Sequence, residues 1–165
     1  MPPTTSDDPR RRPPTGLTRI LARLPVQLYR VGLGRLLGRR MLLLTHTGRN
    51  SGQPRRVVVE VVAYDAANHS WTVASGYGKQ AQWYRNLRHA PGGTVQVGRH
   101  RHHVSAYFLD PEEGAEVMAE YAPRHPRAAR LLCRYLGLPA DGTADAYRAA
   151  GRQIAFVRLV AFPGS

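Results

Sequence analysis

The sequence has one cysteine and one lysine. Cys133 cannot form an intramolecular disulfide, which is typical of a reducing compartment and favours a cytoplasmic protein. It lies in an apolar, helix-like segment, a poor setting for a nucleophile. Lys79 is the only lysine among 24 basic residues, so nearly all of the positive charge is arginine. A GC-rich genome also favours arginine, so the bias alone does not identify an anionic ligand.

The sequence also lacks long apolar runs. None reaches the roughly 18 residues of a transmembrane helix, and the N-terminus has no apolar segment of a signal peptide. Residues 1–16 are instead rich in proline, arginine and aspartate, which predicts a disordered tail.

Several catalytic patterns are missing as well. G-x-S-x-G, H-E-x-x-H and C-x-x-C do not occur, so hydrolytic chemistry has little support. In "HRHH", His100 and His102 would share one face of a strand, but no cysteine or carboxylate nearby completes a ligand set. We therefore predict no metal site.

The chain is long enough for one domain with a real core, since it has 165 residues of which 42% are hydrophobic. Its net charge of +13 indicates an anionic partner. A nucleic acid, a membrane surface and a phosphorylated or carboxylated small molecule all satisfy this charge.

Residues 17–40 have a helical pattern of apolar residues interleaved with arginine, interrupted by Pro25 and two glycines. Two short helices fit this segment better than one long helix. A basic amphipathic arm of this kind can lie on an anionic membrane or pack on the protein's own barrel.

From Met41 the pattern changes to strands rich in apolar and β-branched residues. We expect strands at 41–48, 55–65, 70–76, 94–98 and 101–109, with a short helix at 80–89 between the third and fourth. An Asn50-Ser51-Gly52 turn joins the first two strands as a hairpin. Residues 41–165 thus predict an α+β domain on a small, mostly antiparallel barrel.

Helices are expected again late in the chain. Asp110, Pro111 and Glu113 have the pattern of a capping box with proline at the first helical position, which predicts a helix to about Tyr121. A second helix should end at Gly137. A loop or single helical turn should then lead to a last strand at 153–162.

The segment "GYGKQA" at 76–81 matches a relaxed dinucleotide fingerprint. The following helix is short for a parallel crossover, and the next strand ends at Arg99 where an acidic residue is expected. An NADP-type site is therefore an alternative with little support.

Two other segments carry candidate binding residues. In "LLLTHTGRNSGQPRR", a glycine-bounded turn exposes backbone N–H groups beside Arg49, Ser51 and the Arg55-Arg56 pair. Taken alone, a solvated basic hairpin explains this turn as well as an anion site does. In "QWYRNL", Trp83 and Leu87 have the spacing of core anchors, while Asn86 and the helix N-terminus could still face a ligand.

Together, "LLLTHTGRNSGQPR", "VASGYG", "QWYRNL" and "APGGTVQVG" resemble the deazaflavin-dependent nitroreductase and quinone reductase family. The resemblance extends from about Met41 to Leu109. It implies a split β-barrel of the flavin-reductase or FMN-binding kind, with flanking helices and an N-terminal helical arm. It also implies an oxidoreductase that uses the reduced deazaflavin coenzyme F(420).

The resemblance implies roles for individual residues. Arg49, Asn50, Ser51 and Gly52, with Arg55 or Arg56, would hold the coenzyme phosphate. The backbones of Val57, Val58, Val59, Ala74, Ser75 and Gly76 would edge the deazaflavin ring, Trp83 and Asn86 would close the pocket, and Lys79 would meet the polyglutamyl tail. Glu60, Tyr77 and Tyr107 would contact the substrate, and a proton would come from Ser75, from Tyr77 or Tyr107, or from solvent.

The chain departs from the family at two positions. Asn50 stands where the family commonly has lysine, which removes one charged contact, and Ala81 stands where the family has proline before the helix. The expected reaction is hydride transfer to a quinone, nitro compound or activated C=C, without an acid-base dyad.

Other functions remain as alternatives. They are a non-catalytic flavin or deazaflavin binder and an FMN-dependent reductase on the same barrel. We expect no nucleic-acid partner, because the aromatic residues cluster in "QWYRNL" and do not alternate with basic residues along strands. A homodimer and a peripheral membrane contact through residues 17–40 are both compatible with the sequence.

Overall fold

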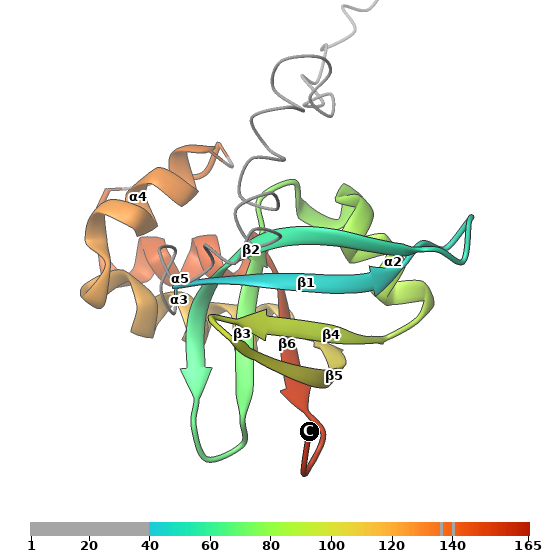
Figure 1. Ribbon diagram of the computed structural model, residues 1–165. Coiled ribbons are helices and arrows are strands. Elements are labelled where there is room, and N and C mark those ends of the chain that lie inside the picture. The colour runs from blue at the N-terminus through green and yellow to red at the C-terminus, as the bar shows by residue number, and fades with distance from the viewer. Residues whose placement is uncertain (1–39, 136, 140) are drawn as a thin grey trace, which may run out of the picture.

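The computed structural model describes residues 40–135, 137–139 and 141–165. The tail predicted for residues 1–16 lies outside this range, as does the arm predicted for residues 17–40 apart from Arg40. The described residues form an α+β structure in which six strands make a barrel and helices lie against it (Figure 1).

The barrel closes in the strand order β1-β2-β3-β6-β5-β4, and every pairing is antiparallel. The strands are β1 (Met41–Thr47), β2 (Pro54–Asp65), β3 (Ser70–Ser75), β4 (Gly92–Val97), β5 (His100–Phe108) and β6 (Ala155–Ala161). The barrel predicted from the strand pattern is therefore confirmed, with each of the six strands within two residues of its expected bounds.

Strand β2 changes neighbours along its length. Residues 54–60 pair with β1, whereas the pairing with β3 covers only residues 61–65. Val61 lies opposite Val73, and the register shifts immediately afterwards. Continuing this register would place Val59 opposite Ser75, but the two strands have separated there. This separation is the split in the barrel, and it lies on the side of the β1–β2 turn.

The barrel interior follows the two-residue period of the strands. Leu42 and Leu44 of β1, Val59 of β2, and Trp71 and Val73 of β3 point into one buried cluster. Trp83, Tyr84 and Leu87 of α2 (Gln82–His89) belong to the same cluster. Helix α2 therefore closes one end of the barrel with its apolar face, and its position is set by core packing.

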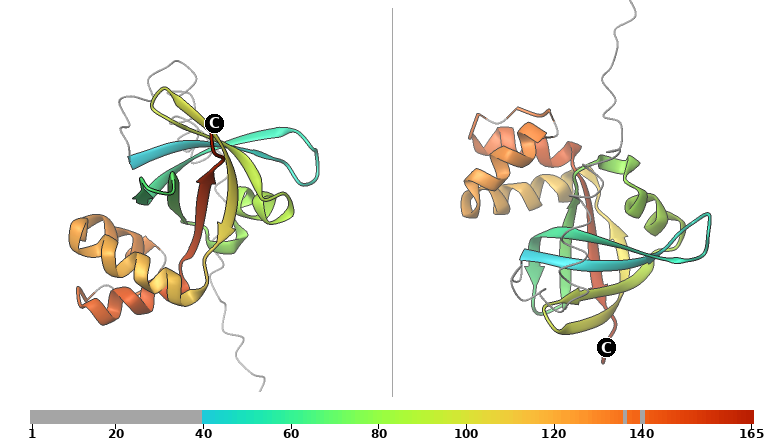
Figure 2. Two further views of the ribbon diagram at one scale, coloured as in Figure 1. Left: turned by 90° about the horizontal axis from the view of Figure 1, so that it is seen from below. Right: turned by 45° about the horizontal axis from the view of Figure 1, so that its top comes forward.

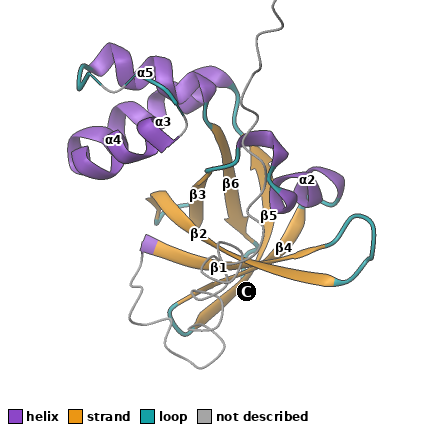
Figure 3. Ribbon diagram, turned by 90° about the horizontal axis from the view of Figure 1, so that it is seen from above, coloured by secondary structure: helices purple, strands orange, loops and turns teal. Residues whose placement is uncertain are grey.

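Three more helices gather on another side of the barrel: α3 (Pro111–Arg124), α4 (Pro126–Tyr135) and α5 (Ala144–Gln153) (Figure 2). Their buried side chains form a second cluster that includes Met118, Tyr121, Tyr147 and Phe156 of β6. Seen from above, α2 lies apart from them, beside the tip of the β1–β2 hairpin (Figure 3). The helical layer and the hairpin end are thus separate regions of the molecule.

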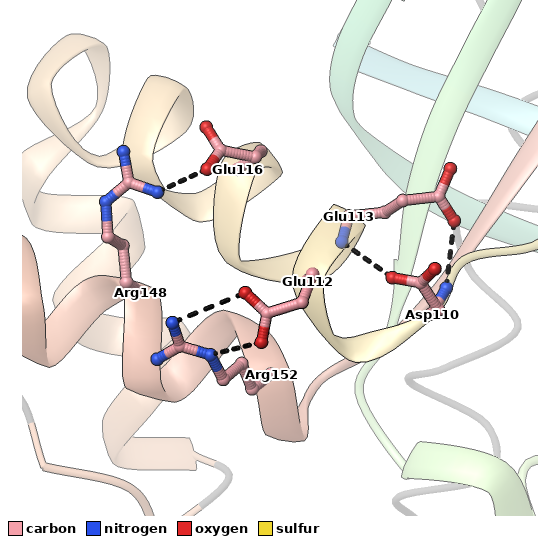
Figure 4. A network of polar contacts seen from close by, with 6 residues as sticks. All are labelled: Asp110, Glu112, Glu113, Glu116, Arg148 and Arg152. Carbon is pink, nitrogen blue, oxygen red and sulfur yellow. Dashed lines mark hydrogen bonds and ion pairs between the residues drawn. The ribbon is translucent and has the colours of Figure 1, made fainter.

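The start of α3 is the predicted capping box. The Asp110 side chain accepts from the backbone N–H of Glu113, and the Glu113 carboxylate accepts from the N–H of Asp110 (Figure 4). Arg148 and Arg152 of α5 bind Glu116 and Glu112 of α3. These ion pairs are largely exposed, so they contribute little to stability compared with the packing beneath them.

The expectation of a loop or single turn before the last strand was wrong, because α5 is a ten-residue helix. The Thr143 hydroxyl caps it by accepting from the N–H of Ala146. Its buried residues are Tyr147, Ala150 and Gly151, and two of these three are too small to give a clear hydrophobic period. Helix α3 also runs one turn beyond the predicted end at Tyr121.

Small residues on this face let α3 and α5 approach each other closely. A Cβ atom built on Gly151 would overlap the carbonyl oxygen of Gly114 and would lie 2.8 Å from the Cα of Ala115. A Cβ built on Gly114 would overlap the carbonyl oxygen of Gly151 in the same way. Backbone contact between the two helices therefore requires glycine at both positions.

We predict that Gly151→Ala destabilises the protein by about 1–3 kcal/mol through overpacking, although alanine is the better helix former by about 1 kcal/mol. Ala149→Gly, at an exposed position of the same helix, is the control and should lose about 1 kcal/mol from helix propensity. Urea unfolding measures both variants. A Gly151→Ala variant more stable than wild type would show that the helices have room to spare.

Candidate functional site

The β1–β2 turn is a compact, hydrogen-bonded loop. The N–H of Gly48 donates to the carbonyl of Gln53 at 2.8 Å, and the N–H of Gly52 donates to the carbonyl of Gly48 at 2.8 Å. Gly52 has a φ of 66°, a value that suits glycine. Among the described residues, the backbone N–H groups of Asn50 and Ser51 have no hydrogen-bond partner. The turn therefore presents unused donors at its tip.

Arg49 ties this turn to helix α2. Its backbone N–H donates to Oδ1 of Asn86 at 3.2 Å, and its Nη1 donates to the same oxygen at 2.9 Å. Nη1 also donates to Oε1 of Gln82 at 2.9 Å. Within the described part of the chain, Nε and Nη2 of Arg49 make no hydrogen bond or ion pair. One edge of the guanidinium is thus held while the other can meet an anion.

Asn86 is only 5% exposed, and both ends of its amide are engaged. Because Oδ1 receives two donors from Arg49, Nδ2 is the end that faces Nδ1 of His46, at 3.1 Å. Nδ1 must then accept, so the His46 ring is neutral and carries its proton on Nε2. Burial, together with the nearby charge of Arg55, lowers the pKa of His46 to about 4.

His46 was not among the residues predicted for the site. The sequence contains a signal for it, because His46 continues the two-residue period of Leu42 and Leu44 and so points into the barrel. Gln82, the other partner of Arg49, carries no comparable signal, since it lies on the exposed side of α2.

Arg55 and Arg56 stand on opposite faces of β2, as consecutive strand residues must. Arg55 pairs with His46 and lies on the inner face, where the stem of its side chain packs beside Gly48. Arg56 pairs with Thr45 on the outer face. One ligand at the hairpin can therefore meet Arg55 together with Arg49 more readily than it can meet both arginines of the pair.

The distribution of charged residues favours an anionic ligand at this end of the barrel. Glu60 and Asp65 are the only carboxylates between residues 41 and 109. Asp65 binds Asn68 in the β2–β3 turn, and Glu60 binds Arg40 and Tyr121. Among the described residues, the basic side chains of the hairpin, the 3-10 turn η2 (Gly78–Gln80) and α2 take part in no ion pair; these are Arg49, Arg55, Arg56, Lys79, Arg85 and Arg88.

The residues expected to edge a ring lie on the two sides of the split. Val57 and Val59 point into the barrel, and Val58 points outward. The backbone of these three residues is not paired with β3, because that pairing begins only at Val61. Ala74 packs toward the helical layer, and Ser75 is buried. The Ser75 hydroxyl donates to the carbonyl of Gly78 at 2.6 Å, which holds the chain as it enters η2.

The residues after β3 differ in exposure. Gly76 is half-buried, Tyr77 and Lys79 are exposed, and Trp83 is buried in the barrel core. Trp83 therefore anchors α2, and Asn86 holds the hairpin. Ala81, at the position where the family has proline, donates its N–H to the carbonyl of Gly78 at 3.4 Å, a bond that proline could not make.

The three expected substrate residues are not brought together. Glu60 accepts from the hydroxyl of Tyr121 on α3 at 3.2 Å, and burial together with the Glu60 charge raises the pKa of Tyr121 to about 12. Tyr107 lies exposed on β5 opposite Arg158, which binds Glu113 at the other end of α3. Glu113 and Tyr121 are eight positions apart, which is about 12 Å along the helix. Tyr77 alone adjoins the split.

Two cavities lie away from the hairpin. One of about 480 Å³ is lined by Arg40 and residues 125–128, at the start of α4. The other, of about 310 Å³, lies among α3, α4 and α5. Neither is lined by the residues around Arg49.

The histidines of "HRHH" contact neighbouring side chains of the barrel strands. The His102 ring packs on Trp71 with a centroid distance of 5.3 Å, and His103 lies beside Thr94. Within residues 40–135, 137–139 and 141–165, no group of three or more His, Cys, Asp or Glu side chains could hold a metal ion. No helix in these ranges is long and apolar enough to cross a membrane.

The profile of the F(420)H(2)-dependent quinone reductase family matches residues 21–130 of this chain, two thirds of its length. The chain belongs to this family. The resemblance inferred from the sequence motifs is thereby confirmed, and the family consists of oxidoreductases that use reduced F(420). No curated protein matches the sequence.

Solved structures agree on the fold. An F(420)-H2 dependent reductase, FDR-A, superposes with a TM-score of 0.51 at 24% identity, covering 74% of this chain and 95% of its own. A domain-swapped dimer gives 0.50 at 22% identity, with coverages of 82% and 98%. HutZ, a heme storage protein from Vibrio cholerae, gives 0.52 at 16% identity, with coverages of 82% and 90%. At these identities the similarity establishes the split-barrel fold.

The residues around the hairpin fit an anionic, planar coenzyme. The turn offers unused N–H groups and one free edge of a guanidinium, which are donors suited to phosphate. The split offers an unpaired strand edge beside Val57 to Val59, suited to the polar rim of a flat ring. The donor set lacks any carboxylate that would oppose such a ligand.

We predict that folding stability falls as the pH drops from about 6.5 to about 4. The pKa of His46 is lower in the folded protein than in the unfolded chain, so acid protonates the unfolded chain first. His46→Gln cannot titrate and keeps an acceptor near Asn86. Between pH 7 and 4.5, wild type should lose about 2 kcal/mol more than this variant, as measured by urea unfolding. Parallel pH profiles would mean that His46 is not buried as a neutral ring.

Proposed function

We propose that this protein transfers hydride from reduced F(420) to a small electron-poor acceptor, such as a quinone, a nitro compound or an activated C=C. The proposal is carried by the hydrogen bonds of Arg49 to Asn86 and Gln82, which join the basic hairpin to α2 beside the split. Family membership supplies the coenzyme class.

In this proposal the hairpin binds the coenzyme phosphate. The free edge of Arg49, the N–H groups of Asn50 and Ser51 and the Ser51 hydroxyl supply donors, and Gly52 allows the turn to close. Arg55 adds charge from the inner face, and Arg56 from the outer face. Lys79, exposed on η2, meets the negatively charged tail.

The ring would lie along the split, against the backbones of Val57 to Val59 and of Ala74 to Gly76. A 5-deazaflavin supplies two-electron hydride chemistry when bound. Because the split adjoins the closed core, Val57 and Val59 keep water from one side of the site. Trp83 and Asn86 fix the helix and the hairpin that flank the split.

A proton for the reduced acceptor can come from three sources. The Ser75 hydroxyl is buried and already donates to Gly78, so it would have to exchange this bond for one to the acceptor. Tyr77 is 45% exposed and adjoins the split, which makes it the better placed of the two side chains. Solvent is the third source.

The test is a titration of the purified protein with F(420), followed by absorbance measurements of the reduced coenzyme after menadione is added. We expect saturable binding and loss of the reduced coenzyme that depends on the protein. Binding without turnover over a panel of quinones and nitro compounds would favour the non-catalytic binder. No binding would refute the proposal.

We predict that Arg49→Ala weakens F(420) binding about tenfold to a hundredfold, because hydrogen bonds to charged groups contribute about 1.5–3 kcal/mol. Arg99→Ala removes the same charge from the turn at the other end of the barrel and should bind like wild type. Fluorescence titration at constant ionic strength measures both affinities. Equal losses in the two variants would indicate that only net charge matters.

We predict that Asn50→Lys binds F(420) several-fold more tightly than wild type, because it restores the charge that the family commonly has at this exposed turn position. The gain should shrink at high salt, since an exposed charge is screened. Asn50→Gln is the uncharged control of similar length. An unchanged affinity for Asn50→Lys would show that Arg49 and Arg55 already satisfy the phosphate.

A further inference from the structure

The buried ring of His46 is linked to the proposed phosphate site by two successive hydrogen bonds, from His46 to Asn86 and from Asn86 to Arg49. His46 contacts Asn86 at 3.1 Å, and Asn86 accepts from both the backbone and the guanidinium of Arg49. His46 itself is 5% exposed and lies on the inner face of β1, so it cannot contact the phosphate directly. Any effect on the ligand must therefore pass through Asn86.

His46 supports the orientation of Asn86 that binds Arg49, because it is the partner of the buried NH₂ group. An amide can be turned by 180° with little change in shape, which exchanges the carbonyl oxygen and the NH₂ group. Only one orientation places the oxygen toward the two donors of Arg49, and the same orientation requires an acceptor at the opposite end. The Nδ1 atom of the neutral ring is that acceptor.

The orientation of Asn86 in turn decides where Arg49 points. With its oxygen toward the hairpin, Asn86 holds Nη1 and the N–H of Arg49, and Gln82 holds Nη1 from the other side. With the NH₂ group there, two donors would face the donors of Arg49, and only the bond from Nη1 to Gln82 would still hold the guanidinium. Among the described residues, no other hydrogen bond or ion pair holds this side chain.

We propose that His46 is a positioning residue for the coenzyme phosphate: through Asn86 it holds Arg49 with one guanidinium edge turned toward the ligand. This inference rests on the proposed function for its effect on the coenzyme. The orientation of Asn86 and Arg49 does not rest on the proposed function. The positioning role and the proposed function can therefore fail separately.

The first arm of the experiment needs no coenzyme. In ¹⁵N NMR spectra of the ligand-free protein at pH 7, we expect His46 to show an unprotonated Nδ1 and a protonated Nε2. In His46→Leu, which removes the acceptor, the N–H of Arg49 should exchange with solvent at least tenfold faster than in wild type. A protonated Nδ1, or unchanged exchange in His46→Leu, would overturn the inference whatever the protein binds.

The second arm compares F(420) with the same deazaflavin carrying only its ribityl chain, which lacks the phosphate and the tail. His46→Leu should weaken F(420) binding about tenfold and leave binding of the phosphate-free compound within twofold of wild type. His46→Gln, which can accept from Asn86, should restore most of the affinity. Equal losses for both ligands would mean that the variant disturbs the barrel core, and the positioning role would be wrong.

A double-variant cycle links the two residues. If His46 acts through Arg49, then His46→Leu should add less than twofold to the loss already caused by Arg49→Ala. Independent, multiplied losses would contradict the proposed path. His100→Gln, at an exposed position on the far end of the barrel, is the control for removal of a histidine. If wild type binds neither ligand, the proposed function fails while the NMR arm still decides the inference.

Discussion

The buried amide of Asn86 is the contact on which the rest of the candidate site depends. It joins the hairpin after β1 to helix α2, although Arg49 and Asn86 are 37 residues apart in the chain. A hairpin of this length would otherwise project from the barrel with only its own turn hydrogen bonds to order it. Trp83 and Leu87 anchor α2 in the barrel core. Through the Asn86 amide, the exposed basic turn is therefore held against a fixed helix.

The split in the barrel has the same origin as this link. Strand β2 pairs with β1 on the hairpin side of Val61 and with β3 only from Val61 onward. Strand β3 continues to Ser75, and the chain then enters η2 and α2. The unpaired edge of β2, the turn and the start of α2 therefore meet at one end of the barrel. A separate cluster under α3, α4 and α5 supports the opposite side, with the close contact of Gly114 and Gly151 at its centre.

Much of this fold was predictable because its signals are local. The Asn50-Ser51-Gly52 turn, the two-residue periods and the capping box at Asp110 each depend on a few neighbouring residues. Helix α5 was missed because its buried face is built from alanine and glycine around Tyr147, so the sequence shows little periodic hydrophobicity. The tertiary approach of α3, which no local pattern reports, stabilises it.

The candidate site divides in the same way. The motifs named Arg49 and Asn86 separately, but the bond between them depends on a contact across the fold, and Asn86 was expected to face the ligand itself. His46 carried a usable signal, since its position in the period of Leu42 and Leu44 places it inside the barrel. Glu60 and Tyr107 were grouped by family resemblance, yet they lie toward different ends of α3.

An amide NMR titration of the protein with oxidised F(420) would test the location of the coenzyme site most directly. We predict that the largest shift changes fall in residues 48–59 and 75–86, with little change around the cavity at residues 125–128. Changes concentrated at that cavity, or spread evenly over the surface, would contradict a coenzyme site built from the hairpin, the split and α2.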